Sequence, residues 1–268
     1  MKKFGRFNDV IKWTAQQMYD YSYEVHTEKW QGKEIKHDPK YTMIETLNLS
    51  FSCQMSTDIK EIGKQINPNF AWADEHFEER VSGLPLNPPP SHVRWPYAQK
   101  NNEEFGGNEK FSHTYPERIW PKYGELENGL RSDKPADKIK GIRYDYGDFA
   151  DVISLMAREP FTRQAFLPIW FPEDTGSVTG ERVPCTIGYH FIRRGDWVHV
   201  VYYIRSCDFF RHFRDDIYLC AKKVFWLIEK LREKDPENWN HVKPGMLTMH
   251  ITSLHAWAVE KPLLKKIM

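Results

Sequence analysis

Two predicted β-strands followed by one long predicted helix constrain the fold of this chain most. Residues 186–193 and 197–205 are rich in β-branched and aromatic residues, and the Arg194-Gly195-Asp196 segment between them favours a hairpin turn. From Ile217 to Leu231 apolar residues then recur at helical spacing. We therefore expect an antiparallel strand pair and a long helix whose polar face carries Lys222, Lys223, Glu229 and Lys230.

The remaining periodic segments predict one domain that spans residues 1–268. Helical spacing is found over residues 7–18, 72–81 and 149–156, and strand-like runs occupy residues 42–55 and 246–252. The region between residues 83 and 147 is rich in turn residues and charge, so we expect it to be too polar for a second core. The predicted fold class is α+β, a mixed or antiparallel sheet packed on long helices.

Charge and cysteine usage exclude several classes of partner. The chain has 38 Lys and Arg against 37 Asp and Glu, so no net field favours nucleic acid or a membrane surface. Its four cysteines lack zinc-type spacing, and His113, His190, His250 and His255 lack the spacing of metal ligands, so no metal is expected. With no signal peptide and no apolar run of roughly 18 residues, we expect a cytoplasmic protein.

Cys185 is the candidate nucleophile. A cysteine at the start of a strand is most often a small buried apolar residue. Here, however, the second strand of the hairpin ends in Arg205-Ser206-Cys207-Asp208, and an arginine near the thiol would lower its pKa and bind an anion. A thiolate beside an anion site indicates a nucleotide substrate.

Four blocks in this order resemble the thymidylate synthase superfamily, and most closely its phage-type deoxycytidylate hydroxymethylase branch. They are Val183-Pro184-Cys185-Thr186 with Tyr189-His190-Phe191, then Arg205-Ser206-Cys207-Asp208, then Phe213-Arg214-Asp215-Asp216, then Leu254-His255-Ala256-Trp257. With weaker matches around Tyr115 and Arg163, the resemblance covers about residues 110 to 257. It implies a thymidylate synthase-like domain that forms a homodimer through its sheet.

The resemblance also implies a reaction. The Cys185 thiolate would add to C6 of a pyrimidine, and C5 would then attack the one-carbon unit of 5,10-methylenetetrahydrofolate, the co-substrate. Water adding to the resulting methylene gives a hydroxymethyl group, whereas hydride gives a methyl group. Only eleven residues follow Trp257, fewer than the tail that shields hydride transfer in thymidylate synthases, which favours hydroxymethylation.

Further roles come from the resemblance residue by residue. It implies that Arg205 and Ser206 hold the 5′-phosphate, with Arg163 from the other subunit; that His255 and Trp257 lie at the sugar; and that Tyr115 assists proton movement near the thiol. Asp208 and Trp95 would meet the folate. A water-organising glutamate is expected among Glu75, Glu78 and Glu79, with Glu79 preferred. The chain departs from the family pattern at Arg163-Gln164, where paired arginines are usual, at His190, where Gln is usual, and at Trp257, where Tyr is usual.

Asp216 determines the predicted base. Thymidylate synthases carry Asn at the position that Asp216 resembles, and an amide can pair with O4 and N3–H of uracil. A carboxyl group accepts from the N4 amino group of cytosine and, when protonated, donates to N3. The alternative is that Asp215 or Asp216 only caps the long helix.

The leading hypothesis is therefore a homodimeric dCMP C5-hydroxymethyltransferase. A dCMP C5-methyltransferase and a catalytically silent nucleotide-binding relative remain as alternatives. A cysteine protease fits poorly, because no Asn or Asp is evident that would orient a Cys–His pair.

Overall fold

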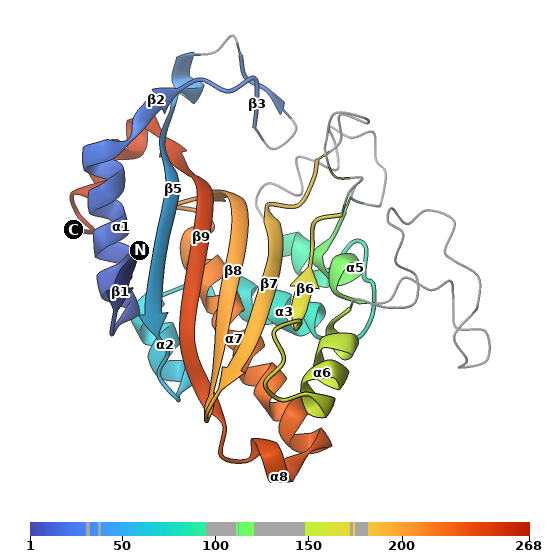
Figure 1. Cartoon of the computed structure of the whole chain (residues 1–268). Coiled ribbons are helices and arrows are strands. Elements are labelled where there is room, and N and C mark those ends of the chain that lie inside the picture. The colour runs from blue at the N-terminus through green and yellow to red at the C-terminus, as the bar shows by residue number, and fades with distance from the viewer. Residues whose placement is uncertain are drawn as a thin grey trace.

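A mixed seven-stranded sheet forms the centre of the computed structural model (Figure 1), which describes residues 1–30, 33–36, 39–94, 111, 113–120, 148–171, 174 and 182–268. The strand order is β1-β5-β9-β8-β7-β6, and β2 also pairs with β5. The β5–β9 and β7–β8 pairs are antiparallel, whereas β8 and β9 are parallel. The strands are β1 (Lys2–Phe4), β2 (Tyr23–Val25), β5 (Met43–Gln54), β6 (Phe166–Pro168), β7 (Thr186–Arg194), β8 (Trp197–Asp208) and β9 (Lys243–Trp257), and a separate pair is β3 (Lys29–Trp30) with β4 (Lys33–Glu34).

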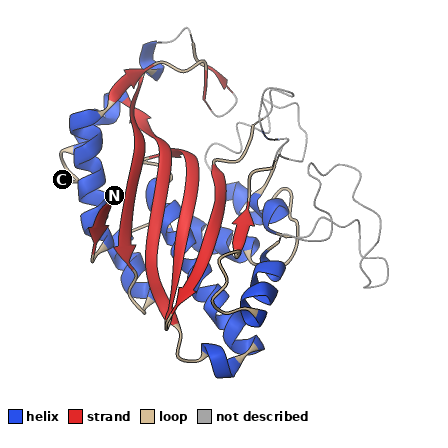
Figure 2. Ribbon diagram, in the orientation of Figure 1, coloured by secondary structure: helices blue, strands red, loops and turns tan. Residues whose placement is uncertain are grey.

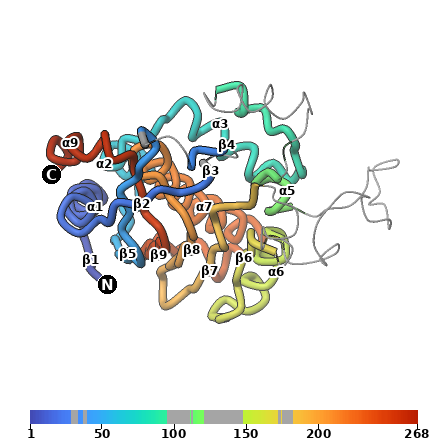
Figure 3. The backbone as a smooth tube through the Cα atoms, turned by 90° about the horizontal axis from the view of Figure 1, so that it is seen from above, coloured from blue at the N-terminus to red at the C-terminus, as the bar shows by residue number. Residues whose placement is uncertain are grey.

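Helices cover one face of the central strands, as Figure 2 shows, and the core lies between that face and α7. Seen from above in Figure 3, α1 lies beyond β5 at one end of the sheet and α6 lies at the other. The helices are α1 (Phe7–Tyr21), α2 (Ile59–Ile66), α3 (Phe70–Arg80), α5 (Tyr115–Ile119), α6 (Phe149–Arg158), α7 (Phe213–Lys234), α8 (Pro236–Trp239) and α9 (Lys261–Leu264), with short 3₁₀ turns η1 (Pro39–Tyr41), η2 (Pro90–Arg94) and η4 (Ala258–Glu260). The predicted α+β class is confirmed.

The predicted hairpin forms β7 and β8. Arg194 pairs with Trp197, which leaves Gly195 and Asp196 as the two loop residues, and Gly195 has a φ of 54° that favours glycine. The first turn of α7 follows a few residues after the end of β8. This hairpin therefore places the residues before β7, the end of β8 and the start of α7 close together.

One expectation about burial is wrong. Lys223 is fully buried rather than exposed, because α7 packs against the sheet and also against α2, α3 and α6. The stretch around α5 also contributes to the core, through Ile119 and Trp120. There the polar groups are satisfied internally: the buried Arg118 guanidinium binds both carboxylate oxygens of Asp174 at 2.6 and 2.9 Å.

Candidate active site

The register of the sheet gathers the predicted residues at one end of β8. The Arg205 amide donates to the Cys185 carbonyl at 2.9 Å, so the nucleophile lies beside the end of β8. Ser206 pairs with Ser253, and Asp208 pairs with His255 on β9. Sequence blocks twenty to seventy residues apart thus share one corner of the sheet, next to the first turn of α7.

Cys185 is the half-buried thiol of the chain, whereas Cys53, Cys207 and Cys220 are buried. Burial raises the pKa of the Cys185 thiol above its ordinary value; the positive charges of Arg205 and Arg182 act in the opposite direction, and Asp216 adds to the increase. The predicted effect of Arg205 is thus present, but burial outweighs it. In the free protein at neutral pH, Cys185 is therefore a protonated thiol.

This protonation predicts how the protein reacts with iodoacetamide, which attacks thiolates. We expect the rate of Cys185 alkylation to rise with pH and to reach its midpoint above pH 9.0, the ordinary pKa of this group. A Cys185→Ser variant should lose this reaction, since the other three thiols are buried. Mass spectrometry of the modified peptide at each pH measures the rate. A midpoint near neutrality would contradict the assigned environment.

Arg205 holds the segment that precedes the nucleophile. Its Nε donates to the Pro184 carbonyl at 2.9 Å and its Nη2 to the Val183 carbonyl at 3.0 Å. The guanidinium carbon also lies 5.5 Å from the centre of the Trp170 ring. Nη1 has no hydrogen-bond partner among the described residues, so this nitrogen remains able to bind an anion.

Asp216 is not a helix cap, and neither is Asp215. His212 occupies the N-cap position of α7, and the Asp215 carboxylate accepts the Asn69 amide at 2.8 Å. The Asp216 carboxyl group accepts the Tyr202 hydroxyl at 3.4 Å and the Cys207 thiol at 3.5 Å. Burial raises the pKa of Asp216 to about 6, against the effect of the Arg80 guanidinium. The capping alternative is therefore wrong, and Asp216 is a carboxyl group with a perturbed pKa inside the site.

Tyr115 approaches the thiol through a chain of hydroxyl groups. Thr186, next to Cys185, donates to the Tyr115 hydroxyl at 3.2 Å and shares a 2.9 Å hydrogen bond with the Tyr202 hydroxyl. Since Tyr202 also donates to Asp216, the chain links Tyr115 to Asp216. Burial and the nearby Cys185 raise the pKa of Tyr115 to about 12, so the phenol keeps its proton.

The structure distinguishes the three candidate glutamates. Glu75 pairs with Arg94 at the surface and Glu78 is exposed, whereas Glu79 is buried. The Glu79 carboxylate accepts His76 Nδ1 at 3.0 Å and the Ser91 hydroxyl at 2.6 Å. Arg80 donates to His76 Nε2 at 2.9 Å and lies 4.0 Å from the centre of the Tyr115 ring. Glu79 therefore joins the site through this network rather than by a direct contact with Cys185.

The Asp208 carboxylate is hydrogen-bonded to residues that follow it in the chain. Its carboxylate accepts the Phe210 and Arg211 amides at 3.0 Å, and the Arg211 guanidinium at 3.1 Å. Arg211 also binds Glu260 at 2.8 Å, in the segment after β9. Trp257 at the end of β9 is half-buried, 5.3 Å from the Tyr41 ring.

One predicted residue is not part of this arrangement. Arg163 is exposed just before β6, and the register of β6 with β7 (Phe166 with His190) places it toward the opposite end of β7 from Cys185. Trp95 lies outside the described residues. Within one chain the site therefore combines Cys185, Tyr115, Arg205, Ser206, Asp208, Asp216 and His255.

Sequence reasoning missed the layer beneath the site. Arg80, Tyr202 and Lys223 are all buried next to the residues described above, and each has an electrostatic or hydrogen-bond link to Asp216. Tyr202 could have been found from strand alternation, which points it inward from β8. Lys223 lies seven residues after Asp216 and hence on the same side of α7, a spacing that could have identified it.

The fold defines a class: this chain has the thymidylate synthase fold. A scan against models of protein families finds none that matches, and a search of curated proteins finds none either. Among solved structures, thermostable thymidylate synthase A from Bacillus subtilis matches with a TM-score of 0.63 and 10% identity, over 100% of this chain and 84% of that chain. At this identity the similarity establishes the fold alone.

In the part of the chain that the structure describes, no helix is long and apolar enough to cross a membrane. Nor does any group of three or more His, Cys, Asp or Glu side chains in that part of the chain stand ready to hold a metal ion.

Proposed function

We propose that this chain is a dCMP C5-hydroxymethyltransferase that uses 5,10-methylenetetrahydrofolate. The observation that carries the proposal is that the Cys185 thiol and the Asp216 carboxyl group lie in the same corner of the thymidylate synthase fold, near enough for the charge of Asp216 to act on the thiol. A thiol supplies the nucleophile for C6 of a pyrimidine, and a carboxyl group matches the N3 and N4 edge of cytosine.

In this proposal Cys185 must lose its proton before it adds to C6. Burial keeps the thiol protonated in the free protein, so the proton has to leave as the base arrives. The Tyr115 hydroxyl lies on the hydroxyl chain beside Cys185 and is positioned to relay protons. Arg205 and Ser206 would bind the 5′-phosphate, and His255 and Trp257 would lie at the sugar. The buried Glu79 network is assigned to ordering water near the base.

The described residues are compatible with a folate. When bound, it would supply a one-carbon unit at the oxidation state of formaldehyde. Asp208 Oδ2 accepts one hydrogen bond, from Arg211, and a carboxylate oxygen can accept a second from an N–H group of a pterin. Residues 258–268 include η4 and α9, and Lys261 and Lys265 lie over the Tyr19 ring of α1.

A homodimer through the open face of the sheet belongs to the same proposal. On that face the Ser50 hydroxyl contacts His250 Nδ1 at 2.8 Å, and the Tyr203 ring stacks on His250 at 5.3 Å. No described helix covers these strands there (Figure 2). The exposed Arg163 would then extend toward the phosphate of the partner's site.

Product analysis tests the proposal against its alternatives. After incubation with dCMP and the folate, we expect the nucleotide to gain the mass of CH₂O. A gain of CH₂ would instead identify a reductive methyltransferase. Neither product, together with no release of tritium from C5 of labelled dCMP, would identify a silent nucleotide-binding protein.

A further inference from the structure

Lys223 is a fully buried lysine beneath the site, and the proposed reaction has no use for it. It lies seven residues after Asp216 on α7, hence on nearly the same side of the helix. Because side chains of a helix tilt toward its N-terminus, Lys223 extends back toward Asp216. Its Nζ has no hydrogen-bond partner among the described residues. Burial of an unpaired ammonium is costly, so such a residue needs a reason.

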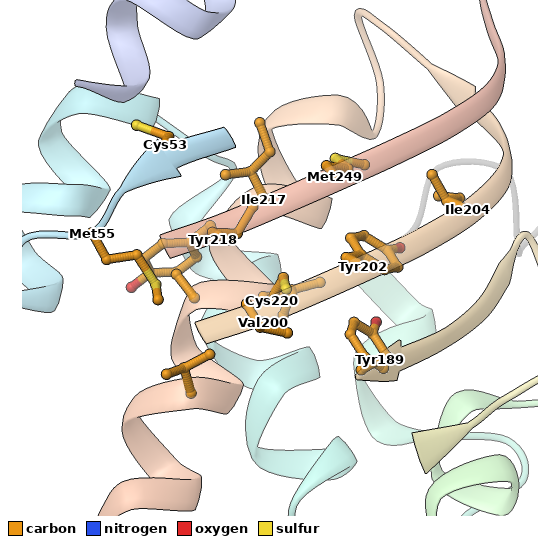
Figure 4. Close-up of a cluster of buried hydrophobic side chains, with 14 of the residues drawn as sticks. Cys53, Met55, Tyr189, Val200, Tyr202, Ile204, Ile217, Tyr218, Cys220 and Met249 are labelled. Atoms are coloured by element: carbon orange, nitrogen blue, oxygen red, sulfur yellow. The ribbon is translucent and has the colours of Figure 1, made fainter. Parts of the chain in front are cut away.

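Two stacked tyrosines link Lys223 to the site. Nζ lies 4.6 Å from the centre of the Tyr189 ring, which is a cation–π distance. Tyr189 stacks on Tyr202 with ring centres 4.6 Å apart and an interplanar angle of 15° (Figure 4). The Tyr202 hydroxyl then donates to Asp216. Lys223 and Asp216 thus contact the same pair of stacked tyrosines, Lys223 at the Tyr189 ring and Asp216 at the Tyr202 hydroxyl.

Arg80 is a second buried cation at the same place. It is 2% exposed, and its Nε has no hydrogen-bond partner in the described part of the chain. Burial lowers the pKa of Lys223 well below its ordinary value and the Arg80 charge lowers it further, whereas the charge of Asp216 acts in the opposite direction. The charges of Arg80 and of protonated Lys223 both oppose the effect of burial on the pKa of Asp216. The protonated form of Lys223 therefore depends on the ionised form of Asp216, and the reverse also holds.

The charge of Asp216 depends on the balance of its surroundings. Burial raises its pKa to about 6, and Arg80, Cys207, Lys223 and Tyr202 oppose that rise. Asp216 in turn raises the pKa values of the other acidic groups near it. The titratable groups that face Asp216 are Arg80 from α3, Tyr115 from α5, Cys185 before β7, Tyr189 from β7, Tyr202 and Cys207 from β8, and Asp215, Cys220 and Lys223 from α7.

We propose that Lys223 is a positioning residue: together with Arg80 it stabilises the ionised form of Asp216 and so sets the pH range in which the site binds cytosine. The inference rests on the proposed function. A protonated Asp216 both donates to N3 and accepts from N4, whereas the carboxylate only accepts. Without Lys223, we expect Asp216 to remain protonated up to a higher pH.

A Lys223→Met variant of the full chain tests this. Methionine has a similar length and no charge, and removal of an unpartnered buried amine should leave the fold intact. We expect the pH midpoint of dCMP binding, measured by calorimetry between pH 5 and 9, to move upward by about one unit. Lys223→Arg keeps the charge and should keep the wild-type midpoint. Should the methionine variant not fold, Lys223→Leu replaces it.

Lys222→Met is the matched control. Lys222 pairs with Asp74 at 2.8 Å, away from Asp216, so its loss should not move the midpoint. The double variant Lys223→Met with Asp216→Asn should show no shift relative to Asp216→Asn alone, since the group that titrates is gone. A folded Lys223→Met variant with the wild-type midpoint would overturn the inference.

A measurement without ligand separates this inference from the proposed function. Carbon-13 NMR of aspartate carboxyl groups, assigned with Asp216→Asn, gives the pKa of Asp216 in the free protein. A higher pKa in Lys223→Met supports the inference even if dCMP does not bind, in which case only the proposed function fails. An unchanged pKa of Asp216 in Lys223→Met, together with tight dCMP binding, would contradict the role inferred for Lys223 and leave the proposed function intact.

Discussion

A Cys185→Ala variant should lose release of tritium from C5 of labelled dCMP by on the order of 10⁴-fold or more, because no other group in the site can add to C6. The exchange depends on a covalent bond to C6, so loss of the thiol removes the step itself. Binding of dCMP should persist, since Arg205, Ser206 and Asp216 remain. A radiochemical exchange assay measures the loss, and calorimetry measures the binding.

Cys53→Ala is the matched control for this variant. Cys53 is fully buried on β5, and burial raises its pKa to about 12, so it takes no part in thiolate chemistry. Its replacement should reduce stability and leave exchange within a factor of about two. Exchange that survives in Cys185→Ala would exclude thiol addition at this residue.

An Asp216→Asn variant should reverse the preference between dCMP and dUMP. The amide of asparagine can donate to O4 of uracil and accept from its N3–H, whereas the ionised carboxylate of Asp216 can only accept and offers no donor to O4. With about 1–3 kcal/mol for each mismatched polar group, we expect a change of roughly 100-fold in the ratio of the two kcat/KM values. Parallel steady-state assays with the two nucleotides measure this ratio.

Asp215→Asn provides the control at the adjacent position. Asp215 accepts the Asn69 amide, whereas the Tyr202 hydroxyl donates to Asp216, so this variant should lose stability but keep the wild-type base preference. An unchanged preference in Asp216→Asn, or an equal change in both variants, would show that Asp216 does not read the base.

The sequence predicted the C-terminal half of the fold well, because local signals agree there. The turn at Gly195 and the apolar stripe of α7 each specify one structure. The last strand is longer than predicted, since β9 extends to Trp257 rather than ending at residue 252, and its parallel pairing with β8 was not predicted. The first hundred residues lack motifs of the family, yet the structural match covers the whole chain. A strand such as β5 needs only alternating burial, which many sequences satisfy.

The burial of Arg80 and Lys223 beneath the site could not be predicted for a different reason. Helical spacing predicts a polar face for Lys223, because the apolar stripe of α7 is narrower than the surface of the helix that is buried. The helix is covered on several sides, and only the three-dimensional packing reveals that. Likewise Arg80 ends a helix rich in acidic residues, although Ala73 and Phe77 at helical spacing lie on the same buried face.

The buried pair of Arg80 and Lys223 also limits how this protein can evolve. A single change of Asp216 to asparagine would remove the carboxylate whose charge favours the protonated forms of both buried groups, so we expect this variant to fold but to be less stable. Recognition of uracil would therefore arise most easily after Lys223 had already been replaced by an apolar residue. The choice of base is thus tied to the order in which mutations occur, because a residue that never meets the nucleotide determines how much stability that change costs.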